Sequence, residues 1–369
     1  MPPQADWIGI VGQVAAWALP PLPQRPLDDE LLKTPAFTEE FLRCVAHQRI
    51  GGLVAAAADA GALDRAPPHL RQKLGVANTE ALRASLAIEA HAIAVSDALT
   101  SAGIDHALLK GCATAHLDYP DPELRHTGDV DLFVDRSHFA RLDKLLPATG
   151  HRRALPPFSD RWELSYAKDI TYLAPSGIEV DVHLNLVGGY WGVRSDWASL
   201  LQRRDWFDLA GSTLPALDAP GRVIQAAVHS ASGAAPRLGS AADVFQITGT
   251  QPDVVGAVAE RAADLGAAPL VATGVLRSAE AFGGVDTEIA TWAQSVPVAD
   301  SERAALAALA SGRGHAVWMS GARALPVPRR VAYLTPLLLP SRQHLRARGL
   351  SRVDHLRASM SAVRPRRSD

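Results

Sequence analysis

Cysteine is scarce in this chain, since Cys44 and Cys112 are the only two among 369 residues. They lie far apart in the sequence and form no CxxC pair, so neither a zinc site nor a disulfide framework is expected. So little cysteine is typical of a protein in a reducing compartment.

Long apolar runs are also missing. Residues 8–19 are apolar, but this stretch has no cationic region before it and is shorter than the roughly 18 residues that a bilayer-spanning helix needs. No other segment has an uninterrupted apolar run of that length. We therefore expect a soluble, cytoplasmic protein with no membrane partner.

A strong net charge is absent too. The formal net charge is −2, which argues against nucleic-acid binding driven by bulk charge. Arginine is nevertheless concentrated near the C-terminus, where residues 323–369 hold eleven arginines and two acids, a balance of about +9 against about −11 for the rest. This segment either contacts an anion or is a solvated arginine-rich tail, and both interpretations stay open.

The length and a hydrophobic content of 47% allow a sizeable core divided among two or three regions. We predict an α+β protein with a small mixed-sheet core at residues 104–210. Helical regions are expected at residues 1–103 and 211–325, and a basic segment at residues 326–369.

Local patterns place several elements within these regions. Residues 106–109 are typical of a short strand, and residues 170–174 and 178–186 predict a β-hairpin closed by Pro175, Ser176 and Gly177. Ser137 is expected to cap a helix that ends near residue 146, and Asn78 or Thr79 is expected to begin a helix in the N-terminal region.

Asp129 and Asp131 lie two residues apart in an apolar run that predicts a strand. Strand side chains alternate between faces, so both carboxylates are expected on one face, while Val130, Leu132 and Val134 can face a core. Two neighbouring carboxylates repel each other unless water or a cation lies between them. Oxygen ligands on a rigid strand suit Mg²⁺.

The second strand of the expected hairpin carries Glu179, Asp181 and His183 on one face. Together with Asp129 and Asp131, Asp181 can hold two divalent ions that activate an attacking oxygen and stabilise a departing pyrophosphate. Asp181 can also accept the proton of an incoming hydroxyl. Glu179 shares its face and is the alternative third ligand.

Lys110 and Gly111 end the first expected strand and begin a helix. Glycine allows a phosphate to approach the backbone, and the first N–H groups of a helix bind anions. Arg125 can hold phosphate oxygens with its planar guanidinium. The alternative for Arg125 is a structural ion pair.

The motifs Leu109-Lys110-Gly111, Gly128-Asp129-Val130-Asp131 and Val180-Asp181-Val182-His183 together resemble the uncharacterised nucleotidyltransferase family of the DNA polymerase β-like superfamily. That superfamily combines a glycine at a helix start, an Asp-x-Asp pair on the next strand and a third carboxylate on a later strand. The helical part of the family carries a histidine, an Arg-Leu pair and an aspartate, which match His229, Arg237-Leu238 and Asp243.

The resemblance implies transfer of a nucleoside monophosphate from an NTP, with ATP as the default donor, to an acceptor nucleophile with release of pyrophosphate. It implies that Asp129, Asp131 and Asp181 are catalytic and hold Mg²⁺ or Mn²⁺. The nucleotide-binding residues expected on this basis are Lys110, Gly111, Cys112, Arg125, Gly128, His183, His229, Arg237 and Asp243. Cys112 stands where the superfamily often has serine, and the stretch between Gly111 and Asp129 is longer than in minimal members.

Two alternatives use the same residues. A GT-A glycosyltransferase also carries an Asp-x-Asp pair, but it needs an N-terminal nucleotide-binding βα unit that residues 1–100 do not offer. A catalytically idle nucleotide-binding or scaffold protein of the same fold is the second alternative. The acceptor is open among small molecules, peptides, proteins and RNA ends.

Overall fold

The computed structural model describes residues 6–19, 22–28, 32, 37–355 and 357. The arginine-rich tail expected at residues 364–369 lies outside them. The helices before the sheet are α1 (Trp7–Ala15), η1 (Ala16–Ala18), α3 (Phe37–Gln48), α4 (Gly51–Asp59) and α5 (Pro68–Ser101).

Helix α5 is one uninterrupted helix of 34 residues, so the helix start predicted at Asn78 is wrong. Its buried face carries Leu70 and Leu74 before that point and Ile88 after it, and this continuous packing keeps the backbone helical. The hydroxyl of Thr79 donates a hydrogen bond to the carbonyl of Gly75 at 2.9 Å, as threonine inside a helix does.

One mixed sheet of seven strands forms the centre of the molecule, with the order β3-β4-β5-β2-β1-β7-β6. The strands are β1 (His106–Leu108), β2 (Val130–Val134), β3 (Arg152–Arg153), β4 (Asp169–Leu173), β5 (Glu179–His183), β6 (Arg204–Leu209) and β7 (Ser212–Leu217). The pairs β2–β5 and β1–β7 are parallel and the other pairs are antiparallel. This sheet, between helical regions, confirms the predicted α+β class.

The hairpin of β6 and β7 was not predicted, and it carries the sheet past residue 210. Its turn consists of Ala210 and Gly211, whose φ angles are +48° and +87°. Two consecutive positive φ angles are typical of the tight turn that matches the twist of a hairpin. The hairpin predicted between β4 and β5 is confirmed.

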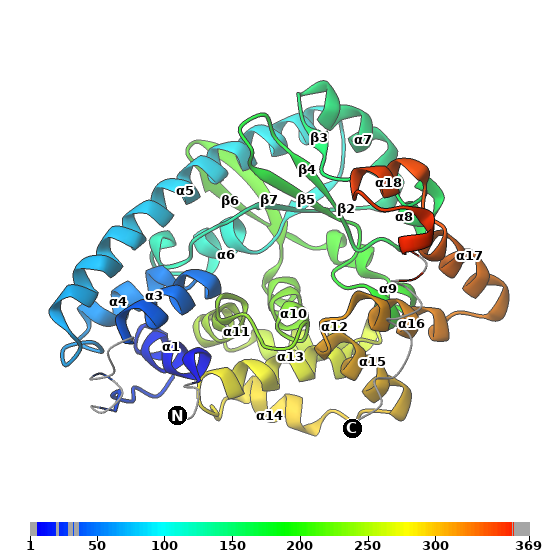
Figure 1. Cartoon of the computed structure of the whole chain (residues 1–369). Coiled ribbons are helices and arrows are strands. Elements are labelled where there is room, and N and C mark those ends of the chain that lie inside the picture. The colour runs from blue at the N-terminus through cyan, green and yellow to red at the C-terminus, as the bar shows by residue number, and fades with distance from the viewer. Residues whose placement is uncertain (1–5, 20–21, 29–31, 33–36, 356, 358–369) are drawn as a thin grey trace.

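The two faces of the sheet pack against different helices (Figure 1). On one face, Val130, Leu132 and Val134 join a core with residues of α5 and α7 (Phe139–Ala148). On the other face, Phe133 belongs to the large core formed with the C-terminal helices. Because strand residues alternate, Asp131 shares the face of Phe133 and points toward those helices.

Short helices link the strands, and they are η2 (Pro122–Leu124), η3 (Arg136–His138), η4 (Trp197–Gln202), α6 (Gly111–Asp118), α8 (Asp160–Tyr166) and α9 (Gly189–Arg194). The helical stretch that leads into α7 is capped by Asp135 and not by Ser137 as predicted. The Asp135 carboxylate accepts a hydrogen bond from the Ser137 backbone N–H at 2.7 Å, so the helical turn begins two residues earlier.

The C-terminal helices are α10 (Ala219–Ser230), α11 (Leu238–Thr250), α12 (Val254–Asp264), α13 (Ala268–Ala281), α14 (Glu288–Ser295), α15 (Asp300–Ala310), α16 (Gly314–Ala324), α17 (Val327–Leu338) and α18 (Arg342–Ala347). The last two pack beside α8, where the indole of Trp162 donates to the carbonyl of Tyr333 at 2.8 Å. No helix of the described residues is both long and apolar enough to cross a bilayer.

The basic segment contains two pairs of arginines spaced four residues apart, and only one of the pairs lies within a single helix. Arg342 and Arg346 both lie in α18, but Arg348 is the residue that ends this helix. Gly349 follows with a φ angle of +65°, the left-handed conformation that commonly ends a helix. Arg348 and Arg352 therefore do not lie on one helix.

Candidate active site

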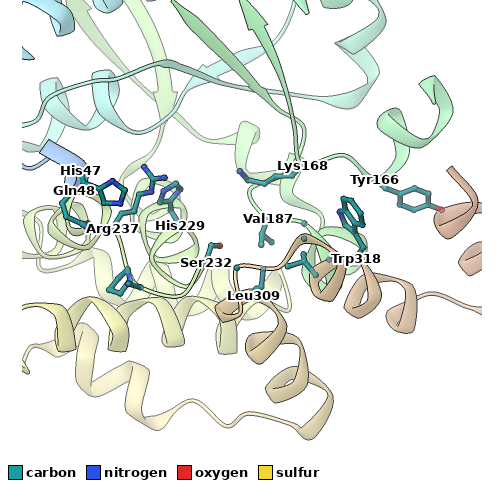
Figure 2. A pocket seen from close by; sticks show the side chains of 18 of the residues that line it. His47, Gln48, Tyr166, Lys168, Val187, His229, Ser232, Arg237, Leu309 and Trp318 are labelled. Carbon is teal, nitrogen blue, oxygen red and sulfur yellow. The ribbon is translucent and has the colours of Figure 1, made fainter. Parts of the chain in front are cut away.

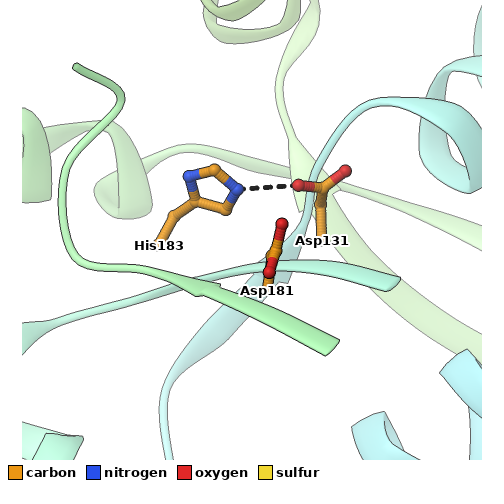
Figure 3. A group of neighbouring side chains, drawn as sticks. All are labelled: Asp131, Asp181 and His183. Atoms are coloured by element: carbon orange, nitrogen blue, oxygen red, sulfur yellow. Dashed lines mark hydrogen bonds and ion pairs between the residues drawn. The ribbon is translucent and has the colours of Figure 1, made fainter. Parts of the chain in front are cut away.

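Two carboxylates lie side by side where β2 and β5 run parallel. Asp131 is directly opposite Asp181 in the strand register, and His183 lies two residues further along β5 on the same face. One ligand atom of each of these three residues lies within 4.8 Å of the others. Figure 3 shows the three side chains converging above the sheet.

Asp131 is buried and has two partners. The Lys110 ammonium lies 2.7 Å from Oδ1, and Nε2 of His183 donates to the same oxygen at 2.7 Å. Burial alone would raise the pKa of Asp131, but Lys110 and His183 outweigh it and hold this pKa well below the ordinary range. Nδ1 of His183 is left buried with no partner among the described residues.

Asp181 has the opposite electrostatic setting. Burial and the nearby Asp131 charge raise its pKa above the ordinary value, although the hydrogen bond from Thr171 works against this. The Thr171 hydroxyl donates to Oδ1 of Asp181 at 2.6 Å. The site thus contains one strongly ionised carboxylate and one whose proton affinity is increased.

Asp129 lies apart from this group, since it directly precedes β2 and is not one of the three residues whose ligand atoms converge. Its carboxylate pairs with Arg49 at 3.3 Å. Gly128 permits that approach, because a Cβ at this position would lie 2.4 Å from Nη1 of Arg49. Glu179 also stays outside the converging group and is exposed at the start of β5.

A cavity of about 310 Å³ lies over the carboxylates, and Asp129, Asp131, Glu179 and Asp181 all line it. Two helices present their first turns to it, through Gly111 of α6 and through Gly239 and Ser240 of α11. Free N–H groups at helix starts favour anions. The cavity therefore combines an acidic floor with anion-binding groups on its walls.

Gly111 is required by a close approach. A Cβ there would lie 2.5 Å from Oγ1 of Thr127. Lys110 caps the helix with a φ angle of +51°, an uncommon conformation for a side-chain-bearing residue. This bend brings the Lys110 side chain back over β2, where it meets Asp131.

Arg125 lines the same cavity, but its guanidinium is occupied. Nε and Nη2 donate to the two carboxylate oxygens of Asp243 at 2.7 and 2.9 Å, and Nη1 donates to the carbonyl of His126 at 2.7 Å. Both side chains are buried. This geometry corresponds to the structural ion pair that was the alternative for Arg125, and it gives Asp243 the same role.

The comparison with protein families identifies the chain. Residues 35–283 match a family described as uncharacterised nucleotidyltransferase. The chain belongs to this family. The match spans more than half of the chain and includes the sheet, α10, α11 and α13. No curated protein matches the sequence.

Among solved structures, the chain is similar to an antigenic nucleotidyltransferase-like protein from Paracoccidioides brasiliensis. The alignment covers 50% of this chain and 91% of that protein, with 16% sequence identity and a TM-score of 0.31. The similarity is remote.

His229 and Arg237 both line the carboxylate cavity. Burial and the neighbouring Lys110 and Lys168 charges lower the pKa of His229 well below its ordinary value, so its imidazole is neutral at pH 7. Arg237 is exposed and has no ion pair within the part of the chain that the structure describes. Its charge is available to a ligand.

Cys112 does not line the cavity over the carboxylates. It is buried in the core shared with α5 and α7. Burial and the nearby Glu89 raise the pKa of its thiol to about 12, so the thiol is neutral and unreactive. The predicted contact of its side chain with phosphate is not supported by this position.

The sequence prediction missed several residues that line the cavity, among them Arg49, Lys168 and Ser240. Arg49 lies between α3 and α4, Lys168 directly precedes β4, and Ser240 lies in the first turn of α11. Lys168 pairs with Asp169 at 2.6 Å. Burial opposes its charge, but Asp169, Asp131 and Asp181 together raise the pKa of Lys168. No local pattern marks these residues, because folding brings them from three distant segments.

Proposed function

We propose that this nucleotidyltransferase transfers a nucleoside monophosphate from an NTP to an acceptor hydroxyl and releases pyrophosphate. ATP is the default donor. The observation that carries the proposal is the register of β2 and β5, which sets Asp131 opposite Asp181 beneath two helix N-termini. An acidic pair for a divalent ion beside anion-binding groups is the combination that an NTP–metal complex requires.

The side chains fit a divalent cation. Asp131 and Asp181 offer carboxylate oxygens within the converging group, as Mg²⁺ and Mn²⁺ prefer. His183 turns its Nε2 toward Asp131 within this group, and an imidazole ligand would favour Mn²⁺ over Mg²⁺. Asp129 lines the same cavity and is the candidate for a further ligand. A bound ion would supply charge neutralisation for the triphosphate and a lower pKa for the attacking hydroxyl.

The triphosphate is assigned to the groups on the cavity walls. The N–H groups at the start of α6 and α11 can bind phosphate oxygens, and Lys110 and Arg237 can pair with them as cations. Arg237 is the better candidate for a guanidinium contact than Arg125, because Asp243 already occupies the Arg125 guanidinium.

Asp181 is the candidate general base. Its raised pKa increases its affinity for the proton that an acceptor hydroxyl loses, which improves proton transfer at neutral pH. In the proposed step, the acceptor oxygen bonds to the α-phosphorus and the bond from that phosphorus to the bridging oxygen breaks. The electron pair of that bond leaves with pyrophosphate, and the proton passes to Asp181.

The direct test is transfer of label from α-³²P NTPs, each supplied with Mg²⁺ or Mn²⁺, to fractions of a cell extract. We expect a labelled product with the wild-type protein and none with Asp181→Asn. Binding is measured separately by calorimetry with Mg–ATP. Lys110→Met should weaken binding by roughly ten- to a hundredfold, the value of a charged hydrogen bond, whereas Lys144→Met, at an exposed position of α7, should not.

The proposal fails if the folded wild-type protein binds none of the four NTPs with either metal. NTP binding without transfer to any fraction would favour the idle nucleotide-binding alternative.

A further inference from the structure

A second, larger cavity of about 730 Å³ adjoins the carboxylate cavity. The two share four lining residues, which are Gln48, Lys168, His229 and Arg237. Figure 2 shows this larger cavity extending from His47 and Arg237 at one end to Trp318 and Tyr166 at the other. Its volume lies within the range of about 300–1,000 Å³ that is usual for small-molecule sites.

The far end of the cavity is aromatic and aliphatic. Trp162 and Tyr166 come from α8, Trp318 from α16 and Tyr333 from α17. Val187, Leu309 and Val317 complete this wall. Aromatic rings from three helices around one space offer flat apolar surfaces, which favour a ligand with a flat apolar body.

The charged groups of the cavity are all on the side nearest the carboxylates. Lys168 and Arg237 lie at the shared boundary, and no aspartate or glutamate is among the described residues that line the larger cavity. Lys168 is already paired with Asp169, whereas Arg237 has no ion pair among the described residues and would repel a cationic ligand. A neutral or anionic ligand is therefore favoured.

The larger cavity lies at a different part of the sheet from Lys110 and the start of α6. Lys168 precedes β4 and Val187 follows β5, the strand that carries Asp181. Lys110, Gly111 and Gly128, on the β1 and β2 side, line only the smaller of the two cavities. A molecule in the larger cavity would thus approach from the Asp181 side, away from Lys110 and the start of α6, with Arg237 at the boundary between the two cavities.

We propose that the larger cavity is the acceptor site, and that the acceptor is a small molecule with a flat apolar body and a neutral or anionic polar end bearing the hydroxyl. This inference rests on the proposed nucleotidyl transfer, since it names the molecule that supplies the attacking oxygen. The hydroxyl bonds to the α-phosphorus, its proton passes to Asp181 and pyrophosphate leaves.

The probe for this site is 8-anilinonaphthalene-1-sulfonate, whose aromatic rings and single sulfonate have the stated chemistry. Its fluorescence should rise on binding to the native protein with saturation at one equivalent. Saturating Mg–ATP should leave the probe bound, because the acceptor and the donor occupy different cavities. Displacement of the probe by Mg–ATP would mean that the cavity takes the nucleoside, and would overturn the inference.

Two variants localise the probe. Trp318→Ala removes an aromatic wall, and Ser232→Trp fills the cavity from α10's end without removing that wall. Each should weaken probe binding by roughly ten- to a hundredfold, as loss of an aromatic anchor does, and leave Mg–ATP affinity unchanged. Trp206→Ala is the matched control, since Trp206 lies on β6 and is 58% exposed.

Thermal unfolding in the presence of Mg–ATP shows which of the two variants remain folded. If neither variant folds, the competition between the probe and Mg–ATP on the wild-type protein still tests the inference. Unchanged probe affinity in a folded Ser232→Trp protein would overturn the acceptor site. A wild-type protein that binds the probe but no NTP would instead contradict the proposed function, so the two failures are distinguishable.

Discussion

Arg125 holds Asp243 through two hydrogen bonds, Nε to Oδ1 at 2.7 Å and Nη2 to Oδ2 at 2.9 Å. The pair joins the loop before β2 to α11, across 118 residues of sequence. The Tyr119 hydroxyl donates to the same carboxylate at 3.0 Å. The link holds the residues just before Asp129 and Asp131 against α11, the helix whose first turn lines the carboxylate cavity.

Arg125→Met should therefore act mainly on stability. It leaves the Asp243 carboxylate buried without its cation, and breaking such a pair costs about 3–5 kcal/mol of unfolding free energy. Urea unfolding measures the loss. Arg43→Met is the control, because its pair with Glu40 is exposed and should contribute at most about 1 kcal/mol. A stable Arg125→Met protein with weakened Mg–ATP binding would restore Arg125 as a phosphate ligand.

Replacing Asp131 or Asp181 with asparagine should change the stability of the protein in different ways. Asp131→Asn removes the charge that Lys110 and His183 stabilise, so metal-free stability should fall by about 1–3 kcal/mol, the cost of leaving a buried partner unsatisfied. Asp181→Asn should keep or raise stability, because burial and Asp131 already disfavour its charge. Both should reduce transfer at least about a hundredfold. Equal stability changes in denaturant titrations would contradict this asymmetry.

Acid should destabilise the fold partly through His126. Burial and the Arg125 charge lower the pKa of His126 from 6.5 to about 4. The folded state favours the neutral imidazole of His126. The stability that this residue allows is therefore complete above pH 6.5, and the free energy of unfolding falls as the pH drops from 6.5 toward 4. His126→Phe should remove about 3 kcal/mol of this acid-dependent loss, at 1.36 kcal/mol per pKa unit. Unfolding measured at pH 7 and pH 4.5 gives the difference, and an identical pH dependence in the variant would refute it.

Two helical glycines should have opposite effects when changed to alanine. A Cβ at Gly274 in α13 would lie 1.9 Å from the carbonyl oxygen of Ala227 in α10, so Gly274→Ala should cost at least about 1–3 kcal/mol through overpacking. A Cβ at Gly256 in α12 would have no atom of another element within 4 Å. Gly256→Ala should stabilise the helix by up to about 1 kcal/mol. Thermal melts of both variants test the close contact of α10 and α13.

The sequence determined the chemistry of the strands. Alternation along β2 and β5 was enough to predict Asp131 and Asp181 on solvent-accessible or ligand-facing sides and their valine and leucine neighbours in a core. The glycine at the start of α6 was likewise predicted from the strand-to-helix turn that it occupies, although the close approach of Thr127 that requires it is a tertiary contact. Such patterns are properties of neighbouring residues, which local backbone geometry controls.

Tertiary structure decided which of these groups meet. The parallel register sets Asp131 opposite Asp181 across 50 residues of sequence, while Asp129, two residues from Asp131, is drawn to Arg49 instead. Arg125 pairs with Asp243, and Lys168 and the start of α11 enter the cavity from segments with no local signal. A charged side chain takes the partner that packing brings within hydrogen-bonding distance, and packing between distant helices and strands leaves no periodic trace in the sequence around either residue.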